Sequence, residues 1–186
     1  MKKIIITFAL LIFTLTANAA WQIDAEQSSV TFVSTKQEHI REIHKIPGVS
    51  GSISVKGELV MTLDLSTIES GIEIRNERMK EMLFKIATFP TATITAQLPD
   101  LSRKTKLDKF DAELNLHGLS KTISVEALVA RTAKGEIMAS LTQPIIINAS
   151  DFGLDAGVAA LQKVAGLTSI GTSVPVYVTL VFKKAS

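Results

Sequence analysis

The chain has 186 residues, a formal net charge of +2 and no cysteine. The absence of cysteine excludes disulfides, thiolate metal sites, a cysteine nucleophile and covalent c-type haem attachment. The length predicts one domain, or at most a small pair of domains.

The first nineteen residues have the pattern of a secretory signal peptide. Two lysines at 2–3 precede an apolar run at 4–15, and Ala-Asn-Ala at 17–19 forms a small-residue cleavage sequence. The apolar run is too short for a convincing membrane span. Cleavage after residue 19 leaves residues 20–186 as the folded domain, with 20 − 2 = 18 basic against 18 acidic residues. We therefore expect an exported domain, outside the cytoplasm, that lacks the basic face needed to bind nucleic acid.

Alternating apolar and polar residues are the commonest pattern after residue 20, and they indicate strands with one buried and one solvated face. The strand candidates are 59–65, 92–98, 110–116, 123–129 and 174–182, with weaker ones at 30–33, 51–55 and 137–141. Short glycine-containing links at 117–121 and 134–136 predict hairpins. The spacing suits a sandwich or a barrel. We favour an all-β, antiparallel, eight-stranded barrel, because closure removes exposed strand edges.

One segment breaks the two-residue period. Four apolar residues recur there at helical spacing: Met79, Met82, Leu83 and Ile86. They predict an amphipathic helix over about 76–86, with Asn76 as the N-cap and Pro90 beyond its end. A second short helix or loop is expected over about 157–166, between flanking glycines.

Several short blocks carry a family resemblance. In chain order they are WQID at 21–24, SSVTF at 28–32, IESG at 68–71, RNERM at 75–79, Phe84, FP at 89–90, LNLHGLSK at 114–121 and INASDFGL at 147–154. Together they resemble the YceI-like family, which consists of periplasmic, lipocalin-like proteins that bind polyisoprenoids. The resemblance implies an eight-stranded antiparallel barrel whose long apolar interior holds one lipid chain. The family commonly has an aromatic pair where Leu83 and Phe84 stand and an arginine at Ala149, so the identity of the ligand stays open.

The interior of such a barrel is either filled by side chains or hollow. Small residues occupy several of the expected inward positions: Ala92, Ala96, Ala112, Ala127 and Ala139. Aromatic residues make up only 5% of the chain, so few bulky groups are present to fill the centre. The same alanines would also suit a solid core in which each meets a large neighbour. The sequence alone leaves both interpretations open, and the resemblance favours a cavity.

The residues that we expect to line a lipid tunnel are apolar and lie mostly in or near the first predicted helix: Phe32, Met79, Met82, Leu83, Phe84, Phe89 and Phe152. Methionine suits this role because its flexible side chain adapts to ligands of varied shape. For each residue alone, a place in an ordinary core is an equally good interpretation. Arg75 matches an arginine of the family and is a candidate ligand for a phosphate or another polar head group. The alternative for Arg75 is a solvated helix face.

Other polar residues give no catalytic or metal-binding pattern. His39 and His44 lack the spacing of a zinc site, and we interpret them as part of an exposed polar loop before Pro47. The serine-hydrolase motif GxSxG and the glycine-rich phosphate-binding motifs are missing.

We therefore expect a non-enzymatic periplasmic protein that binds, transports or sequesters an amphiphilic lipid, either a polyisoprenoid or a fatty-acid derivative. It needs no cofactor and no metal. An enzyme acting on a lipid is one alternative, and it requires a titratable group with a shifted pKa inside the cavity. A solid-core structural or partner-binding module is another. An outer-membrane barrel is a third, disfavoured by the scattered aromatic residues and the charged helix. The oligomeric state is left open, a homodimer included.

Overall fold

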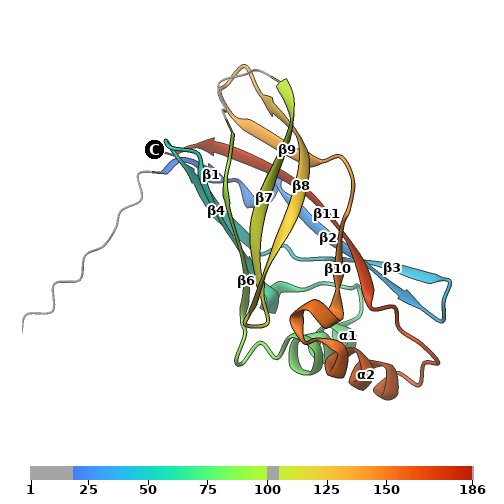
Figure 1. Ribbon diagram of the computed structural model, residues 1–186. Helices are drawn as coiled ribbons and strands as arrows, with labels where there is room; N and C mark the ends of the chain where they lie inside the picture. The colour runs from blue at the N-terminus through green and yellow to red at the C-terminus, as the bar shows by residue number, and fades with distance from the viewer. Residues whose placement is uncertain (1–18, 100–104, 186) are drawn as a thin grey trace, which may run out of the picture.

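The computed structural model describes residues 19–99 and 105–185 (Figure 1). The predicted signal peptide lies outside these ranges except for its last residue. Within the described ranges, eleven strands form one sheet: β1 (Ala19–Ile23), β2 (Ser29–Lys36), β3 (Ile40–Lys45), β4 (Val49–Ser54), β5 (Glu58–Asp64), β6 (Thr91–Gln97), β7 (Thr105–Leu116), β8 (Leu119–Arg131), β9 (Ile137–Leu141), β10 (Ile145–Asn148) and β11 (Ser173–Lys184).

Eight of these strands close into a barrel. Their order is β1-β4-β5-β6-β7-β8-β9-β11, and β11 pairs back with β1 to complete the ring. All the pairings are antiparallel. The predicted eight-stranded antiparallel barrel is therefore confirmed.

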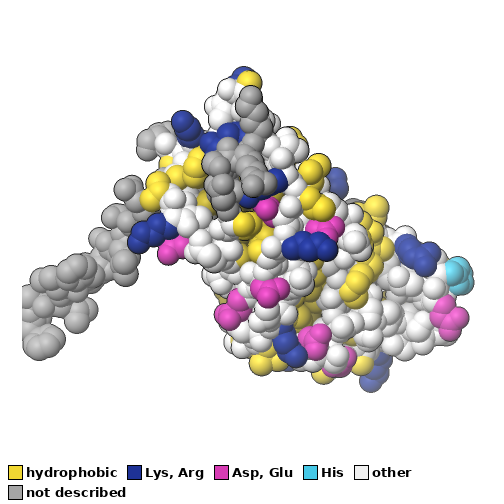
Figure 2. All heavy atoms as spheres, turned by 45° about the horizontal axis from the view of Figure 1, so that its top comes forward, with side chains coloured by type: hydrophobic (Ala, Val, Ile, Leu, Met, Phe, Trp, Pro, Cys, Tyr) yellow, Lys and Arg dark blue, Asp and Glu magenta, His cyan; other side chains and the backbone are white. Residues whose placement is uncertain are grey.

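Three further strands extend the sheet beyond the ring. β2 pairs with β11 next to the β1 pairing, and β10 pairs with β11 next to the β9 pairing. β3 pairs with β2, and the hairpin of β2 and β3 projects from the side of the barrel (Figure 1). Its tip, at the right in both whole-molecule views, carries basic, acidic and histidine side chains close together (Figure 2).

Turn chemistry sets the register of the longest hairpin. Leu116 of β7 lies opposite Leu119 of β8, so only His117 and Gly118 form the turn. Both have positive φ angles, 53° and 78°, as in a type I′ turn, whose twist matches that of the flanking strands. Gly135, with φ 82°, lies in the link between β8 and β9. Both predicted hairpins are confirmed.

The prediction of an exposed loop around His39 and His44 is wrong for its second half. Ile40–Lys45 is strand β3, and His44 lies opposite Phe32 of β2 with only 1% of its surface exposed. The alternation was hidden because the inward positions of β3 are polar: Glu42 and His44 face inward where other strands have aliphatic residues.

Two helical segments follow each other at one end of the barrel. α1 spans Glu73–Arg78 and continues as a π-helix, η3, over Met79–Phe84. The i→i+5 spacing of a π-helix places Phe84 beneath Met79, so these two residues form the buried pair. The segment ends at Lys85, whose left-handed φ of 50° reverses the chain before Pro90 is reached.

The predicted N-cap at Asn76 is wrong, because the helix begins three residues earlier, after Ile72. Asn76 is buried inside α1, where its Oδ1 accepts a hydrogen bond from the Ser70 N–H at 2.8 Å. Its Nδ2 donates to a carboxylate oxygen of Glu69 at 3.1 Å. Asn76 therefore fixes the chain that leads into the helix.

The second segment, predicted as a short helix or a loop over about 157–166, is a helix, α2, Asp155–Val164. Three 3-10 turns, η1 (Ala25–Gln27), η2 (Leu65–Thr67) and η4 (Ala149–Phe152), complete the described elements. α2 packs on η3 at the end of the barrel that lies lowest in Figure 1. A Cβ atom at Gly157 would lie 2.9 Å from the Cα of Leu83 and from the carbonyl oxygen of Met82. The two helices therefore touch backbone to backbone.

This contact predicts that Gly157→Ala lowers the free energy of unfolding, contrary to the usual effect of alanine in a helix. Alanine normally stabilises a helix interior by roughly 1 kcal/mol relative to glycine, but here its methyl group forces the helices apart. We expect a net loss of about 1–3 kcal/mol in the free energy of unfolding, measured by denaturant titration. Ala156→Gly, on the exposed face of α2, is the control, because it changes the helix propensity and leaves the contact with η3 unchanged. A stabilised Gly157→Ala variant would contradict the packing.

Candidate functional site

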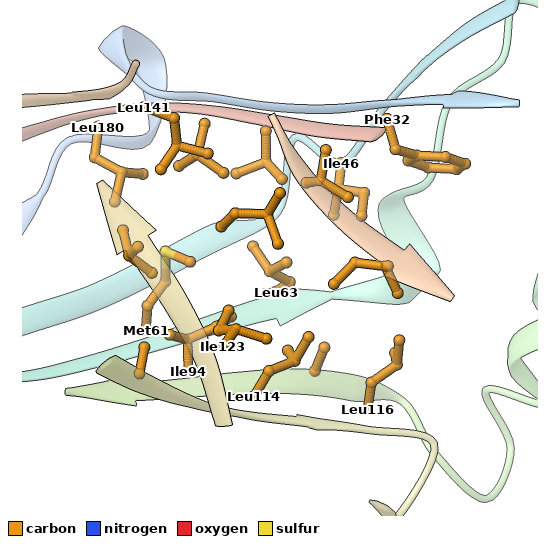
Figure 3. A pocket seen from close by; sticks show the side chains of 18 of the residues that line it. Phe32, Ile46, Met61, Leu63, Ile94, Leu114, Leu116, Ile123, Leu141 and Leu180 are labelled. Carbon is orange, nitrogen blue, oxygen red and sulfur yellow. The ribbon is translucent and has the colours of Figure 1, made fainter. Parts of the chain in front are cut away.

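The inward faces of the strands enclose a cavity of about 240 Å³. Among the described residues that line it, every one is hydrophobic except Asp108, which forms an ion pair with Lys106 at 3.0 Å. Figure 3 shows the lining side chains pointing into the space, with Phe32 near one end and Leu141 and Leu180 at the other. For comparison, an engineered cavity of about 150 Å³ with a similar lining stays dry and binds benzene. The cavity can therefore hold an apolar ligand.

Small side chains explain why the interior is not filled. Ala92, Ala112, Ala127 and Ala139 all line the cavity, as their inward positions predict. Ala96 is partly buried and packs on the core instead. Around them the larger lining residues come from every strand of the ring except β1. These strand residues form most of the site, and alternation already marked them as inward.

The structure places only some of the predicted ligand-binding residues at the cavity. Phe32, Leu83 and Phe84 line it, from β2 and η3. Met79 is buried in the core, and Met82 is partly buried next to α2. Contact with a ligand stays a prediction for all of them.

Phe89 and Phe152 lie elsewhere. The Phe89 ring packs against His117, with 4.4 Å between ring centroids. The Phe152 carbonyl oxygen lies 3.2 Å from Nδ1 of the same histidine. Phe152 is buried beside a groove on the outer surface and is not among the residues that line the cavity.

Polarity rises stepwise along β2 from the cavity outward. Val30 and Phe32 line the cavity, and the next residues on the same face are Ser34 and Lys36. On the neighbouring strand β3, His44 lies opposite Phe32, with 4.9 Å between ring centroids, and Glu42 lies opposite Ser34. The apolar interior thus gives way to a polar cluster within one hairpin.

Arg75, the predicted head-group residue, belongs to this cluster. Its Nη2 lies 3.0 Å from one oxygen of Glu42, and Nζ of Lys36 lies 2.6 Å from the other. Arg75 of helix α1 thereby places a positive charge against the inner face of the hairpin. We refer to Ser34, Lys36, Glu42, His44 and Arg75 as the polar cluster. Sequence reasoning missed all of its members except Arg75.

His44 is the most deeply buried member of the cluster. Its Nε2 lies 2.7 Å from the hydroxyl of Ser34, whereas its Nδ1 is buried without a hydrogen-bond partner in the described structure. Burial and the positive charge of Arg75 lower the pKa of His44 below its usual value, against the opposing effect of Glu42. Burial opposes ionisation of Glu42, but Lys36 and Arg75 outweigh it and lower the carboxyl pKa. At pH 7 the cluster therefore holds a neutral imidazole and an ionised carboxylate.

This burial predicts a pH dependence of stability. Because the folded-state pKa of His44 lies below the unfolded value of 6.5, the unfolded chain binds more protons as the pH falls below 6.5. The free energy of unfolding should fall there, by at most about 1.4 kcal/mol per pH unit from this group. His44→Gln should flatten the decline between pH 6.5 and 5, measured by denaturant titration. His39→Gln at the exposed hairpin tip is the control, and equal slopes for wild type and His44→Gln would contradict the assignment.

A groove on the outer surface meets the cavity wall between β8 and β10. Ile123, Ile145 and Ile147 line both the groove and the cavity. β10 pairs with β11, and no pairing with β8 is present in the described sheet. An ion pair of 3.3 Å joins Lys121 of β8 to Asp151 of η4, the turn that follows β10. In the described structure this part of the wall is held by side-chain contacts and not by strand pairing.

The geometry defines a small β-barrel protein with an apolar internal binding space. The chain matches the YceI-like domain over residues 21–182 and belongs to the YceI-like family, which confirms the resemblance seen in the sequence. A comparison with curated proteins gave no match.

Solved structures show the same fold. A polyisoprenoid-binding domain from Saccharophagus degradans, implicated in plant cell wall breakdown, is 35% identical with a TM-score of 0.86; the match covers 90% of this chain and 99% of that one. BcnA from Burkholderia cenocepacia is 18% identical with a TM-score of 0.68, covering 86% and 98% of the two chains. The YceI protein of Campylobacter jejuni is 19% identical with a TM-score of 0.56, covering 77% and 84%.

Proposed function

We propose that this protein binds one amphiphilic lipid, with the tail enclosed in the barrel cavity, and acts as a periplasmic carrier or sequestering protein. The observation that carries the proposal is the cavity of about 240 Å³ with its almost wholly hydrophobic lining. The 35% identical Saccharophagus degradans domain, described as polyisoprenoid-binding, supports a lipid of the isoprenoid or acyl class.

The energetics favour a tail with a polar contact at its end. Burying about ten methylenes contributes roughly 8 kcal/mol, which corresponds to micromolar affinity before the costs of association are subtracted. Contacts of the head group outside the cavity therefore matter for tight binding.

The proposed periplasmic location rests on the signal-peptide pattern at residues 1–19. No helix in the described part of the chain is long and apolar enough to cross a bilayer. The polarity of the strands also differs from that of outer-membrane barrels, which have a polar lumen and an apolar outer band. Here the lumen is apolar, and outward positions of β6 and β7 carry residues such as Thr93, Thr95 and Glu113.

Passive enclosure explains the site better than catalysis does. Asp108 is the one titratable residue among the described residues that line the cavity, and its carboxylate is held by Lys106. A nucleophile with an adjacent general base is not found in that lining. The hollow interior in turn supports this proposal over a solid-core structural module.

Native mass spectrometry tests the proposal. Residues 20–186 should be produced by export to the periplasm and purified without detergent. We expect a discrete added mass that extracts into organic solvent and is identified there as an isoprenoid or acyl lipid. A clean apo mass, together with no binding of isoprenoid or acyl probes, would overturn the proposal.

Filling the cavity should abolish binding without unfolding the barrel. Ala127→Phe places a ring in the space beside Asp108 and Leu141, the residues opposite Ala127 on β7 and β9. We expect a loss of at least about tenfold in lipid affinity and a destabilisation of no more than about 1–3 kcal/mol. Leu128→Phe, at the next residue and on the exposed face, is the matched control. Equal affinity in both variants would place the tail elsewhere.

A further inference from the structure

We propose that the polar cluster at the hairpin of β2 and β3 binds the head group of the lipid and selects anionic heads, carboxylate or phosphate, over uncharged or cationic ones. This inference rests on the proposed function, because it requires a tail in the cavity. It adds to that function the chemical class of the lipid head group.

The cluster lies where the cavity ends. Phe32 marks one end of the row of lining side chains (Figure 3). Ser34 and Lys36 follow Phe32 on the same strand face, and two residues of strand advance the chain by about 7 Å. A tail that passes Phe32 therefore carries its head group to the level of Ser34 and Lys36.

The charge balance of the cluster favours an anion. Lys36 and Arg75 contribute +2 and Glu42 contributes −1, which leaves +1 while His44 is neutral. Both cations converge on a single carboxylate, at 2.6 Å and 3.0 Å from its two oxygens. A second anionic group placed beside Glu42 would share these donors, and an arginine side chain can bind two acceptors at once.

The buried histidine is the independent sign of a ligand. His44 is 1% exposed, and its Nδ1 lacks a hydrogen-bond partner among the described residues although a buried polar atom normally has one. The imidazole lies beside Phe32 at the end of the cavity. If the Ser34 hydroxyl donates to Nε2, Nδ1 carries the proton and would donate it to a carboxylate or phosphate oxygen of a head group; in the other tautomer Nδ1 would accept from a hydroxyl group or a water molecule.

A purely structural role predicts different behaviour. If the cluster served only to fasten α1 to the hairpin, loss of either Glu42 or Arg75 would weaken the fold and reduce the binding of all ligands alike. If it binds head groups, the two changes act in opposite directions on selectivity. Arg75→Gln removes a cation and lowers the charge to 0, whereas Glu42→Gln removes the internal competitor and raises the charge to +2.

The test uses four ligands with one tail: decanoate, decyl phosphate, decanol and decyltrimethylammonium. Each displaces the uncharged fluorescent probe N-phenyl-1-naphthylamine from residues 20–186 at pH 7.5 and low salt. We expect the two anionic ligands to bind the wild type about tenfold more tightly than decanol, as is typical of one hydrogen bond to a charged group. We expect the ammonium ligand to bind most weakly.

The variants decide between the two roles. Arg75→Gln should remove the preference for anions and leave the affinity for decanol unchanged, and Glu42→Gln should widen the preference. Lys36→Gln repeats the first test from the strand side in case Arg75→Gln fails to fold. Arg41→Gln is the control, because it removes the same charge from the exposed, opposite face of β3.

Two other outcomes are distinguishable. If all four ligands displace the probe from the wild type equally well, the head-group site is overturned while the tail site stands. If neither the probe nor any ligand binds, the tail site fails and the head-group site falls with it.

Discussion

The pairing of β11 with β1 is the constraint on which the rest of the molecule depends. It closes the sheet, and closure turns one face of every strand in the ring toward a shared interior. That interior must be filled or hollow, and the alanines at inward positions of β6 to β9 leave it hollow. Without the closing pair, the same alternating strands would form an open sheet with exposed edges and no enclosed volume.

The surroundings of the two ends of the cavity differ in polarity, and this difference predicts the orientation of a bound amphiphile. Toward Leu141 and Leu180 the lining is hydrophobic except for Asp108, whose carboxylate is paired with Lys106 (Figure 3). Beyond Phe32 the strands β2 and β3, which lie outside the ring, turn their inner face, with His44 and Glu42, toward helix α1. An amphiphile matches such a gradient, because its tail and its head each find a surface of corresponding polarity.

Much of this architecture was predictable from alternation, because a strand in a closed barrel must bury every second residue. All eight predicted strand ranges overlap strands, yet three strands were missed. β3 was hidden because its inward residues are polar, and β10 because three successive isoleucines, Ile145–Ile147, do not alternate. The helix was shifted because a π-helix does not follow the 3.6-residue period. The polar cluster could not be predicted, since its residues meet through the pairing of β2 with the unrecognised strand β3 and through the contact of Arg75 from α1.

The most direct test of the account is the position of a bound tail. Crystals of residues 20–186 grown with 12-bromododecanoate would reveal the terminal bromine by its anomalous scattering. The account predicts a peak inside the barrel, toward Leu141 and Leu180, with the carboxylate near Arg75 and Lys36. A bromine peak confined to the outer surface, or an interior filled by rearranged side chains, would contradict it.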